Sequence, residues 1–302
     1  MSEFKQEVRQ FYDQVGWKLV GEDTYQNARF EDLRPVAREY IHRCHLRVAR
    51  HLKPGGRYLL DAGSGPIQYP EYLEYSRGYQ RRVCADISII ALKEARRRIG
   101  DAQSGGSGLF VVVDIANLPF KPGTFDSVVS LHTIHHLPED EHLQAYGELY
   151  RVLAPQGVAA VVNGWPASRL MRVFDPLIRS ANRLRSFSER RLSRNHPTQN
   201  IQDDAPAENG SKAGAGKAGK TQAKKGTFTS RHDAAWVRQE VGGRMPAEIR
   251  VWRSVSVRFL RALIHPRLGG RLWLRLIFWL EERFPHFFGV NGQYPLIVIR
   301  RW

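Results

Sequence analysis

Short apolar runs alternate with amphipathic stretches between residues 53 and 163. Continuous apolar runs of this length are typical of strands buried on both faces of a parallel sheet. We predict strands at 57–62, 82–86, 109–114, 125–131 and 158–162. The intervening stretches predict a helix that includes 69–75, followed by helices at 88–99 and 139–153. Strict alternation of strand and helix implies parallel pairing, with right-handed crossovers that place helices on both faces of the sheet.

The flanking regions have a different character. Residues 1–30 carry scattered aromatics that predict a helix and a loop, and 35–52 is an amphipathic helix. After Asn163, we predict an arginine-rich helical segment at 167–195, a helix at 231–241, a strand at 249–257, mostly helix over 258–284 and a strand at 294–299. The chain thus divides into a helical cap (1–52), a core (53–163), a basic helix (164–195), a low-complexity insert (196–226) predicted to be disordered, and a C-terminal completion with an amphipathic helical insertion (227–302).

Candidate binding residues gather where the predicted strands end. Gly63 and Gly65 follow the first strand and allow a tight turn with close approach of a ligand to the backbone. Asp61, Asp86 and Asp114 stand at the ends of three strands, and these ends line one crevice in an open α/β sheet. Each acid could instead cap the following helix. Together they favour one extended ligand with hydroxyl and amino groups.

A nicotinamide dehydrogenase is the alternative that the glycine loop alone would allow. Its fingerprint is G-x-G-x-x-G, and the third glycine position, 68, is glutamine here.

Five motifs in order resemble those of the class I S-adenosylmethionine-dependent methyltransferases, in the group that includes the ubiquinone and menaquinone carbon methyltransferases. They are Leu60-Asp-Ala-Gly-Ser-Gly65, Ala85-Asp-Ile-Ser88, Asp114-Ile-Ala-Asn-Leu-Pro-Phe120, Phe125-Asp-Ser-Val-Val-Ser-Leu-His132 with His135-His-Leu137, and Glu148-Leu-Tyr-Arg-Val-Leu-Ala-Pro-Gln-Gly157. The resemblance covers roughly 50–163 and departs from the family where its third glycine is replaced around Pro66-Ile67. It implies a Rossmann-like, doubly wound, seven-stranded and mostly parallel α/β sheet whose last strand is antiparallel.

The resemblance also implies S-adenosylmethionine as cofactor and S-adenosylhomocysteine as product; no metal site is predicted. The loop around Gly63 and Gly65 would hold the methionine part, Asp86 the ribose hydroxyls and Asp114 the adenine amine, with Ile115 packed on the ring. The full set of expected cofactor-binding residues is Asp61, Ala62, Gly63, Ser64, Gly65, Asp86, Ile87, Asp114, Ile115 and His132.

The acceptor side is less defined by the sequence. His132 and His232 are the candidate catalytic residues, although Asp233 beside His232 could equally cap a helix. Candidate substrate-contacting residues, which could equally be core or capping groups, are Tyr12, Trp17, Tyr25 and His136. No Asn/Asp-Pro-Pro-Tyr/Phe follows the fourth strand, which argues against methylation of nucleobase amines. Nothing here selects oxygen, carbon or nitrogen as the acceptor atom.

The strong positive charge of the chain indicates several kinds of negatively charged partner. The formal net charge is +16 and the pI about 10.2, which favours a polyanion, an anionic membrane surface or an acidic substrate. Residues 272–280 are strongly apolar between arginines at 267, 271, 275 and 283. This stretch either covers the sheet or an acceptor pocket, or lies on anionic lipid. Both interpretations favour a small apolar acceptor such as a lipid, quinone or polyketide-like molecule.

Two further classes of function stay open. An RNA-binding methyltransferase would use the basic helices and the lysine-rich insert, although no RNA-binding motif is visible. A scaffold would keep the fold without catalysis.

The expected location is cytoplasmic, with peripheral contact at the inner face of the membrane as an option. The first residues show no signal peptide, and no apolar run reaches 18 residues. Cys84 falls in a predicted buried strand, and neither it nor Cys44 has metal-ligand spacing.

Overall fold

A computed structural model describes residues 3–18, 25–27, 31–101, 107–193 and 229–302. Within these residues, seven strands form one sheet in the order β3-β2-β1-β4-β5-β7-β6. The strands are β1 (Gly56–Ala62), β2 (Tyr79–Asp86), β3 (Ser107–Val112), β4 (Phe125–Leu131), β5 (Leu153–Val162), β6 (Ala247–Arg253) and β7 (Tyr294–Arg300). Strands β1 to β5 pair in parallel, whereas β7 runs antiparallel to both of its neighbours, β5 and β6. The predicted fold class is confirmed.

Alternate residues of each strand supply two separate cores. Leu60 of β1 faces a cluster closed by α4 (His142–Val152) and by α6 (Ala234–Trp236) with the π-helical turn after it (Val237–Val241). The adjacent Leu59 faces the opposite cluster, which includes Tyr75 and Trp252. Helix α3 (Ile89–Asp101) also covers this second face, where Leu92 packs near Cys84. Helices therefore cover both faces of the sheet, and the carboxyl ends of its parallel strands are not covered by these two layers.

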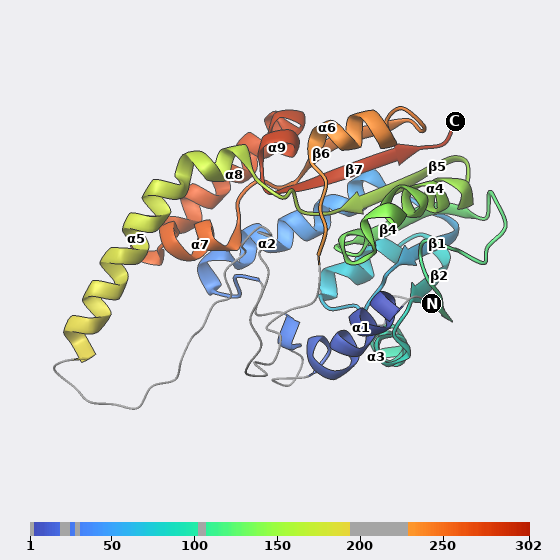
Figure 1. Cartoon of the computed structure of the whole chain (residues 1–302), viewed down its shortest axis with the longest axis horizontal. Coiled ribbons are helices and arrows are strands. Elements are labelled where there is room, and N and C mark those ends of the chain that lie inside the picture. Colours follow the sequence, from blue (N-terminus) through green and yellow to red (C-terminus); the bar gives the residue numbers. More distant parts are fainter. Residues whose placement is uncertain (1–2, 19–24, 28–30, 102–106, 194–228) are drawn as a thin grey trace.

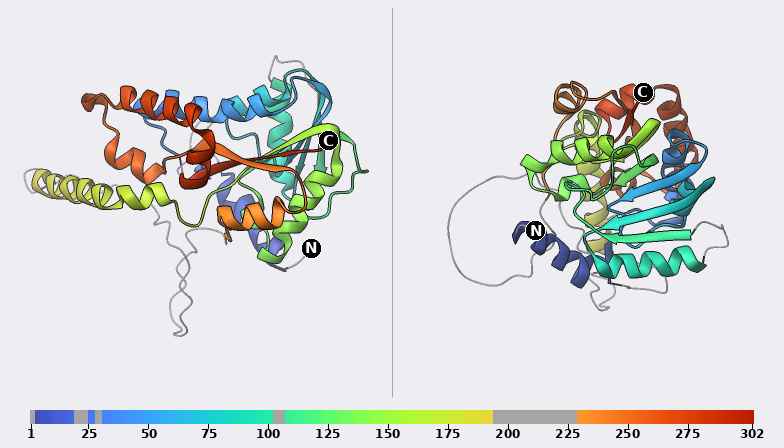
Figure 2. Two further views of the ribbon diagram at one scale, coloured as in Figure 1. Left: turned by 90° about the horizontal axis from the view of Figure 1, so that it is seen from above. Right: turned by 90° about the vertical axis from the view of Figure 1, so that its right-hand side faces the viewer.

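A third cluster lies outside the sheet and is made of helices alone. It joins α2 (Pro35–Arg47), α5 (Arg169–Ser193), α7 (Val257–Leu263) and α8 (Gly270–Arg283). These helices extend beyond the sheet on the left of Figure 1 and of the left view in Figure 2, with α2 and α8 side by side. The short helix α9 (Pro285–Asn291) then leads into β7.

Several predicted boundaries were wrong. The segment around Tyr69–Tyr75 is a 3₁₀ helix (Pro70–Ser76), and β5 begins at Leu153 because that residue already pairs with Phe125 of β4. Strand β6 ends at Arg253, four residues before the predicted end, because Ser256 caps α7 by accepting a hydrogen bond from the Phe259 N–H. The predicted disordered insert at 196–226 lies outside the described residues.

The N-terminal segment crosses the carboxyl edge of the sheet. Helix α1 (Glu3–Phe11) continues into a π-helical turn (Tyr12–Gly16) that ends at Trp17. Its side chains reach residues that follow β2, β3 and β4: Ser88, Asp114 and His136. This segment therefore lies as a cap over the strand ends. Among the described residues, no helix has the length and apolarity to cross a bilayer.

Candidate active site

The turn after β1 is built around two glycines with left-handed backbone. Gly63 has φ +75° and Gly65 φ +54°, conformations that side-chain-bearing residues rarely adopt. A Cβ on Gly63 would lie 2.1 Å from Thr133 Cγ2, so this position has no room for a side chain. The Gly63 N–H donates to the Ala85 carbonyl at 2.7 Å, and the Gly65 N–H donates to Asp86 Oδ2 at 2.9 Å. The turn is therefore held against the end of β2.

Asp86 is a buried acid at that strand end. It is 9% exposed, and its Oδ1 accepts a second backbone hydrogen bond from the Ser88 N–H at 2.8 Å. Burial raises the pKa of this carboxyl from 3.8 to about 6, although the two backbone N–H groups oppose the shift. No cation among the described residues forms an ion pair with it. Each of its oxygens keeps a lone pair, so Asp86 can accept hydrogen bonds from ligand hydroxyls.

Asp114 lies next to Asp86, two residues beyond the end of β3. The adjacency follows from a hydrogen bond of 3.0 Å that the Val113 N–H donates to the Asp86 carbonyl. Asp114 Oδ1 accepts from the Ala116 N–H at 3.0 Å, and its Oδ2 pairs with Lys5 of the cap. Ile115 is buried in the main core. The predicted ribose and adenine residues are thus neighbours of the glycine turn.

Lys5 is a buried cation that the sequence did not reveal as part of the site. Its Nζ pairs with both Asp114 and Glu141, so α1 is fastened across the ends of β3 and β4. Burial opposes the charge, but hydrogen bonds to the two carboxylates outweigh it and raise the pKa of Lys5. The cap is therefore held electrostatically at the acid predicted to receive an amine.

Asp61 is committed to a buried ion pair. Its Oδ2 accepts hydrogen bonds from both Nε and Nη2 of Arg82 on β2, and both side chains are buried. The pair ties β1 to β2 directly below the glycine turn. Direct cofactor contact by Asp61 stays a prediction, and the structure gives this acid a positioning role.

The remaining predicted cofactor residues surround the turn. Ala62 is fully buried, whereas Ser64 and Ile87 are half-buried. The Ser64 N–H donates to the Ala85 carbonyl at 3.3 Å, and its Oγ donates to the Gly65 carbonyl at 3.2 Å. The N–H groups of residues 63 to 65 thus all bond within the protein, so the turn is preformed.

Three of the predicted substrate contacts, all aromatic, form one cluster that reaches the glycine turn through Trp17. Tyr12 and Trp17 stack at 5.0 Å between ring centroids, and Trp17 meets Tyr25 edge to face at 6.0 Å. The Trp17 indole comes within 3.2 Å of where a Gly65 Cβ would lie. Asp13 accepts a hydrogen bond from the Ser88 hydroxyl. These aromatics were predicted as substrate contacts, and the structure brings them to the cofactor side of the crevice.

The histidines after β4 differ in their surroundings. His132 has φ +55°, and its ring packs at 5.0 Å from Trp252 and 5.8 Å from Tyr294. Burial, reinforced by Arg253, lowers the pKa of His132 to about 3, so the ring is neutral and a weak base at pH 7. His136 Nε2 shares a hydrogen bond of 2.7 Å with the Tyr12 hydroxyl and thereby joins this turn to the cap.

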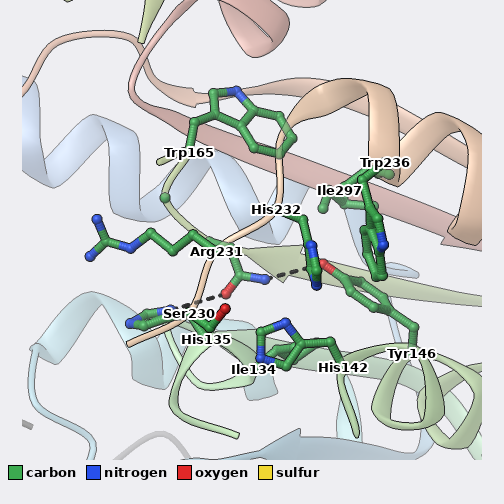
Figure 3. Close-up of a pocket in the computed structure, with 13 residues that line it drawn as sticks. Ile134, His135, His142, Tyr146, Trp165, Ser230, Arg231, His232, Trp236 and Ile297 are labelled. Carbon is green, nitrogen blue, oxygen red and sulfur yellow. Dashed lines mark hydrogen bonds between the residues drawn. The ribbon is translucent and has the colours of Figure 1, made fainter. Parts of the chain in front are cut away.

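A pocket opens beside these histidines at the ends of β4 and β5 (Figure 3). It is a partly open hollow lined by aromatic, imidazole and amide groups. His135 donates to Asn163 Oδ1 at 3.3 Å, and Asn163 Nδ2 donates to the Tyr146 hydroxyl at 3.1 Å. Burial lowers the pKa of His135 well below its usual range, so this relay is neutral at pH 7.

The far wall of the pocket comes from residues 230–236. His232 stacks on Trp236 with 3.7 Å between ring centroids, and His142 meets it edge to face at 4.9 Å. His232 Nε2 and Arg231 Nε are buried and have no hydrogen-bond partner among the described residues. Asp233 caps α6 by accepting from the Trp236 N–H at 2.9 Å. The pocket wall thus contains two nitrogens without a hydrogen-bond partner, and Asp233 acts as the N-cap of α6.

Comparison with known proteins agrees with this geometry. A family model described as a methyltransferase domain matches residues 60–161, from β1 through β5. Residues 60–161 form a methyltransferase domain. The methyltransferase family uses S-adenosylmethionine as its cofactor, and the matched residues contain the glycine turn, Asp86 and Asp114.

The relatives share only part of their length with this chain. A sterol 24-C-methyltransferase of Schizosaccharomyces pombe is 28% identical over 177 residues, covering 52% of this chain and 42% of the relative. Squalene methyltransferase 1 of Botryococcus braunii is 28% identical over 158 residues, covering 50% of this chain and 39% of the relative. The match therefore spans about two fifths of each of these relatives.

A solved structure shares the fold beyond the matched domain. The structure of geranyl diphosphate C-methyltransferase from Streptomyces coelicolor A3(2) covers 100% of this chain and 99% of its own, with a TM-score of 0.52 and 13% identity. At that identity the likeness concerns the fold.

The residues present fit the cofactor. The glycine turn is preformed against the ends of β2 and β4, and Asp86 is a buried carboxylate without an ion-pair cation among the described residues. Asp114 fits an amine because Lys5 already donates to it.

Proposed function

We propose that this chain transfers a methyl group from S-adenosylmethionine to a small acceptor with an apolar, lipid-like body. The observation that carries the proposal is the placement of Asp86 against the glycine turn, 2.9 Å from the Gly65 N–H, inside the matched domain. When bound, S-adenosylmethionine supplies an electrophilic methyl group carried on a positively charged sulfur.

The chain's own residues would bind and shield this cofactor. Asp86 would accept hydrogen bonds from the ribose hydroxyls, and its negative charge favours a cationic ligand. Asp114 would receive the adenine amine, in competition with Lys5 or on the second lone pair of Oδ2. Trp17, held by its stacking with Tyr12, would exclude water from the glycine turn because its indole lies against Gly65.

The pocket beside His135 is the proposed acceptor site. Its apolar walls, which include Trp165 and Trp236, suit a hydrocarbon body, and the printed activities of the sterol and squalene methyltransferase relatives support such an acceptor. Arg231 and His232 would orient a polar group of the acceptor through their unused nitrogens. An Arg231 guanidinium would also stabilise negative charge on an acceptor oxygen.

The acceptor end can be tested by label transfer. The full chain, incubated with methyl-labelled S-adenosylmethionine and an organic extract of cells, should transfer label into the organic phase. Label recovered only in protein or in RNA would contradict the lipid-like acceptor. A protein that binds the cofactor but transfers label to none of these fractions would be a scaffold of the same fold.

The cofactor end needs a matched pair of variants. Asp86→Asn should strongly lower transfer at cofactor concentrations below saturation, because it weakens cofactor binding. Asp175→Asn, which removes a surface carboxylate paired with Arg179 on α5, should leave transfer unchanged.

A further inference from the structure

Helix α8 exposes an apolar face that the fold does not use. Leu272, Trp273, Leu276 and Trp279 lie within an arc of about 120° on the helix, at 100° per residue. All four are exposed, with Trp273 and Trp279 at 58% and 60%. Leu268, in the turn before the helix, is exposed as well. We call these five residues the α8 face.

The opposite side of α8 already provides the packing that the helix needs. Leu274 and Phe278 are each 2% exposed and belong to the helical cluster with α2, α5 and α7. Glu281 is buried and accepts hydrogen bonds from the Tyr40 hydroxyl and Arg47. The α8 face is therefore not a core surface of this chain. Two exposed tryptophans on one contiguous apolar stripe mark an interaction surface.

Arginines flank the α8 face on the side of α2. A shallow groove between the two helices is lined by Arg43, Arg271 and Arg275. Arg275 is paired with Glu39 at 3.0 Å, and the Arg43 guanidinium lies over the Phe278 ring at 3.8 Å from its centroid. One carboxylate thus stands among three guanidinium groups, and the groove has excess positive charge.

This arrangement matches the chemistry of a bilayer surface. Apolar and tryptophan side chains on one face of a helix lie in the interfacial region of a membrane, and arginines beside them pair with lipid phosphates. Arg267 and Arg283 add exposed positive charge at the two ends of α8. Since no described helix can cross a membrane, contact would be peripheral.

We propose that the α8 face docks this protein on an anionic lipid bilayer, with lipid phosphates in the Arg43–Arg271 groove. The alternative occupant is a second copy of the chain. In a two-fold symmetric contact the same arginines would face each other across the interface, and this repulsion disfavours a dimer. A bilayer supplies the opposite charge. The inference is independent of methyl transfer, because α8 lies outside residues 60–161.

The test is flotation of the full chain with two kinds of vesicle: phosphatidylcholine alone, and phosphatidylcholine mixed with phosphatidylglycerol. We expect binding to the mixed vesicles and weak binding to the neutral ones. The variant Trp273→Ala/Trp279→Ala should weaken partitioning about tenfold for each tryptophan, since each loses an interfacial anchor. The variant Arg43→Gln/Arg271→Gln should weaken binding to the anionic vesicles about fivefold for each arginine.

A control separates the α8 face from another exposed tryptophan of the chain. Trp302→Ala removes a tryptophan that is 81% exposed at the C-terminus, away from α8, and should float like the parent protein (Figure 1). Circular dichroism and thermal unfolding should show that the α8 variants fold. Equal flotation of the parent and the tryptophan double variant would overturn the proposal. So would a dimer, seen by light scattering without lipid, that the same variant dissociates.

Discussion

The raised pKa of Asp86 gives a pH dependence that can be measured directly. A shift from 3.8 to about 6 corresponds to about 3 kcal/mol of differential stability between the two protonation states. The folded protein binds this proton more tightly than the unfolded chain. The stability associated with Asp86 is therefore fully present below about pH 4 and is lost as the pH rises towards 6.

Cofactor binding should show the opposite trend. A neutral carboxyl is a weaker acceptor for hydroxyls than a carboxylate and does not attract a sulfonium. We expect the affinity for S-adenosylmethionine, measured by calorimetry between pH 5 and 8, to be level above about pH 6.5. Below pH 6 it should fall by up to tenfold per unit, because the site must first lose its proton.

The variant Asp86→Asn isolates this group. Each hydrogen bond to a charged partner contributes about 1.5–3 kcal/mol, so losing the charge under two hydroxyls should weaken binding roughly 100-fold at pH 7.5. Its binding should no longer depend on pH between 5 and 7. Asp175→Asn should behave like the parent protein. Binding by Asp86→Asn within threefold of the parent, or parent binding that is level from pH 5 to 7, would refute the role of Asp86.

Three further changes probe the turn, the cap and the pocket. Gly63→Ala places a Cβ 2.1 Å from Thr133 Cγ2, so urea unfolding should show that the free energy of unfolding falls by about 2–4 kcal/mol. The control Gly147→Ala lies within α4, where an added Cβ meets no neighbouring side chain within 4 Å. It should raise the free energy of unfolding by about 0.5–1 kcal/mol. Lys5→Met leaves the partly exposed carboxylates of Asp114 and Glu141 without their cation. Thermal unfolding should show that the free energy of unfolding falls by about 1–3 kcal/mol. An unchanged unfolding midpoint would show that other contacts hold the cap. His232→Gln should raise KM for the acceptor at least threefold and leave cofactor affinity unchanged, and the reverse pattern would move His232 to the cofactor side.

Local patterns were enough to predict the central sheet. The strand predicted at 125–131 has those bounds in the structure, and the first strand ends at Ala62 as expected, because a buried parallel strand is a continuous apolar run ended by a turn. The last two strands were also predicted from local patterns, and the family resemblance supplied the antiparallel direction of the last one. Errors arose at edges, as at Leu153, where pairing with a neighbouring strand extends a segment that reads locally as a turn.

The cap and the pocket could not be predicted in the same way. Lys5 and Asp114 are 109 positions apart, and nothing around Lys5 distinguishes it from a surface lysine. The pocket closes because the chain returns over β4, where the Ser230 N–H donates to the His135 carbonyl at 2.9 Å. Asn163 was the accessible signal, since it follows the fifth strand at the same edge as the acids. Arg231 and Tyr146 line the pocket only because long-range packing brings them together, so the local sequence does not identify them as site residues.

The central claim is that the glycine turn and Asp86 form a binding site for S-adenosylmethionine. The most direct measurement is calorimetric titration of the full chain with S-adenosylmethionine and S-adenosylhomocysteine at pH 7.5. The account predicts saturable binding of both with one site per chain. Failure of the correctly folded protein to bind either compound would contradict it.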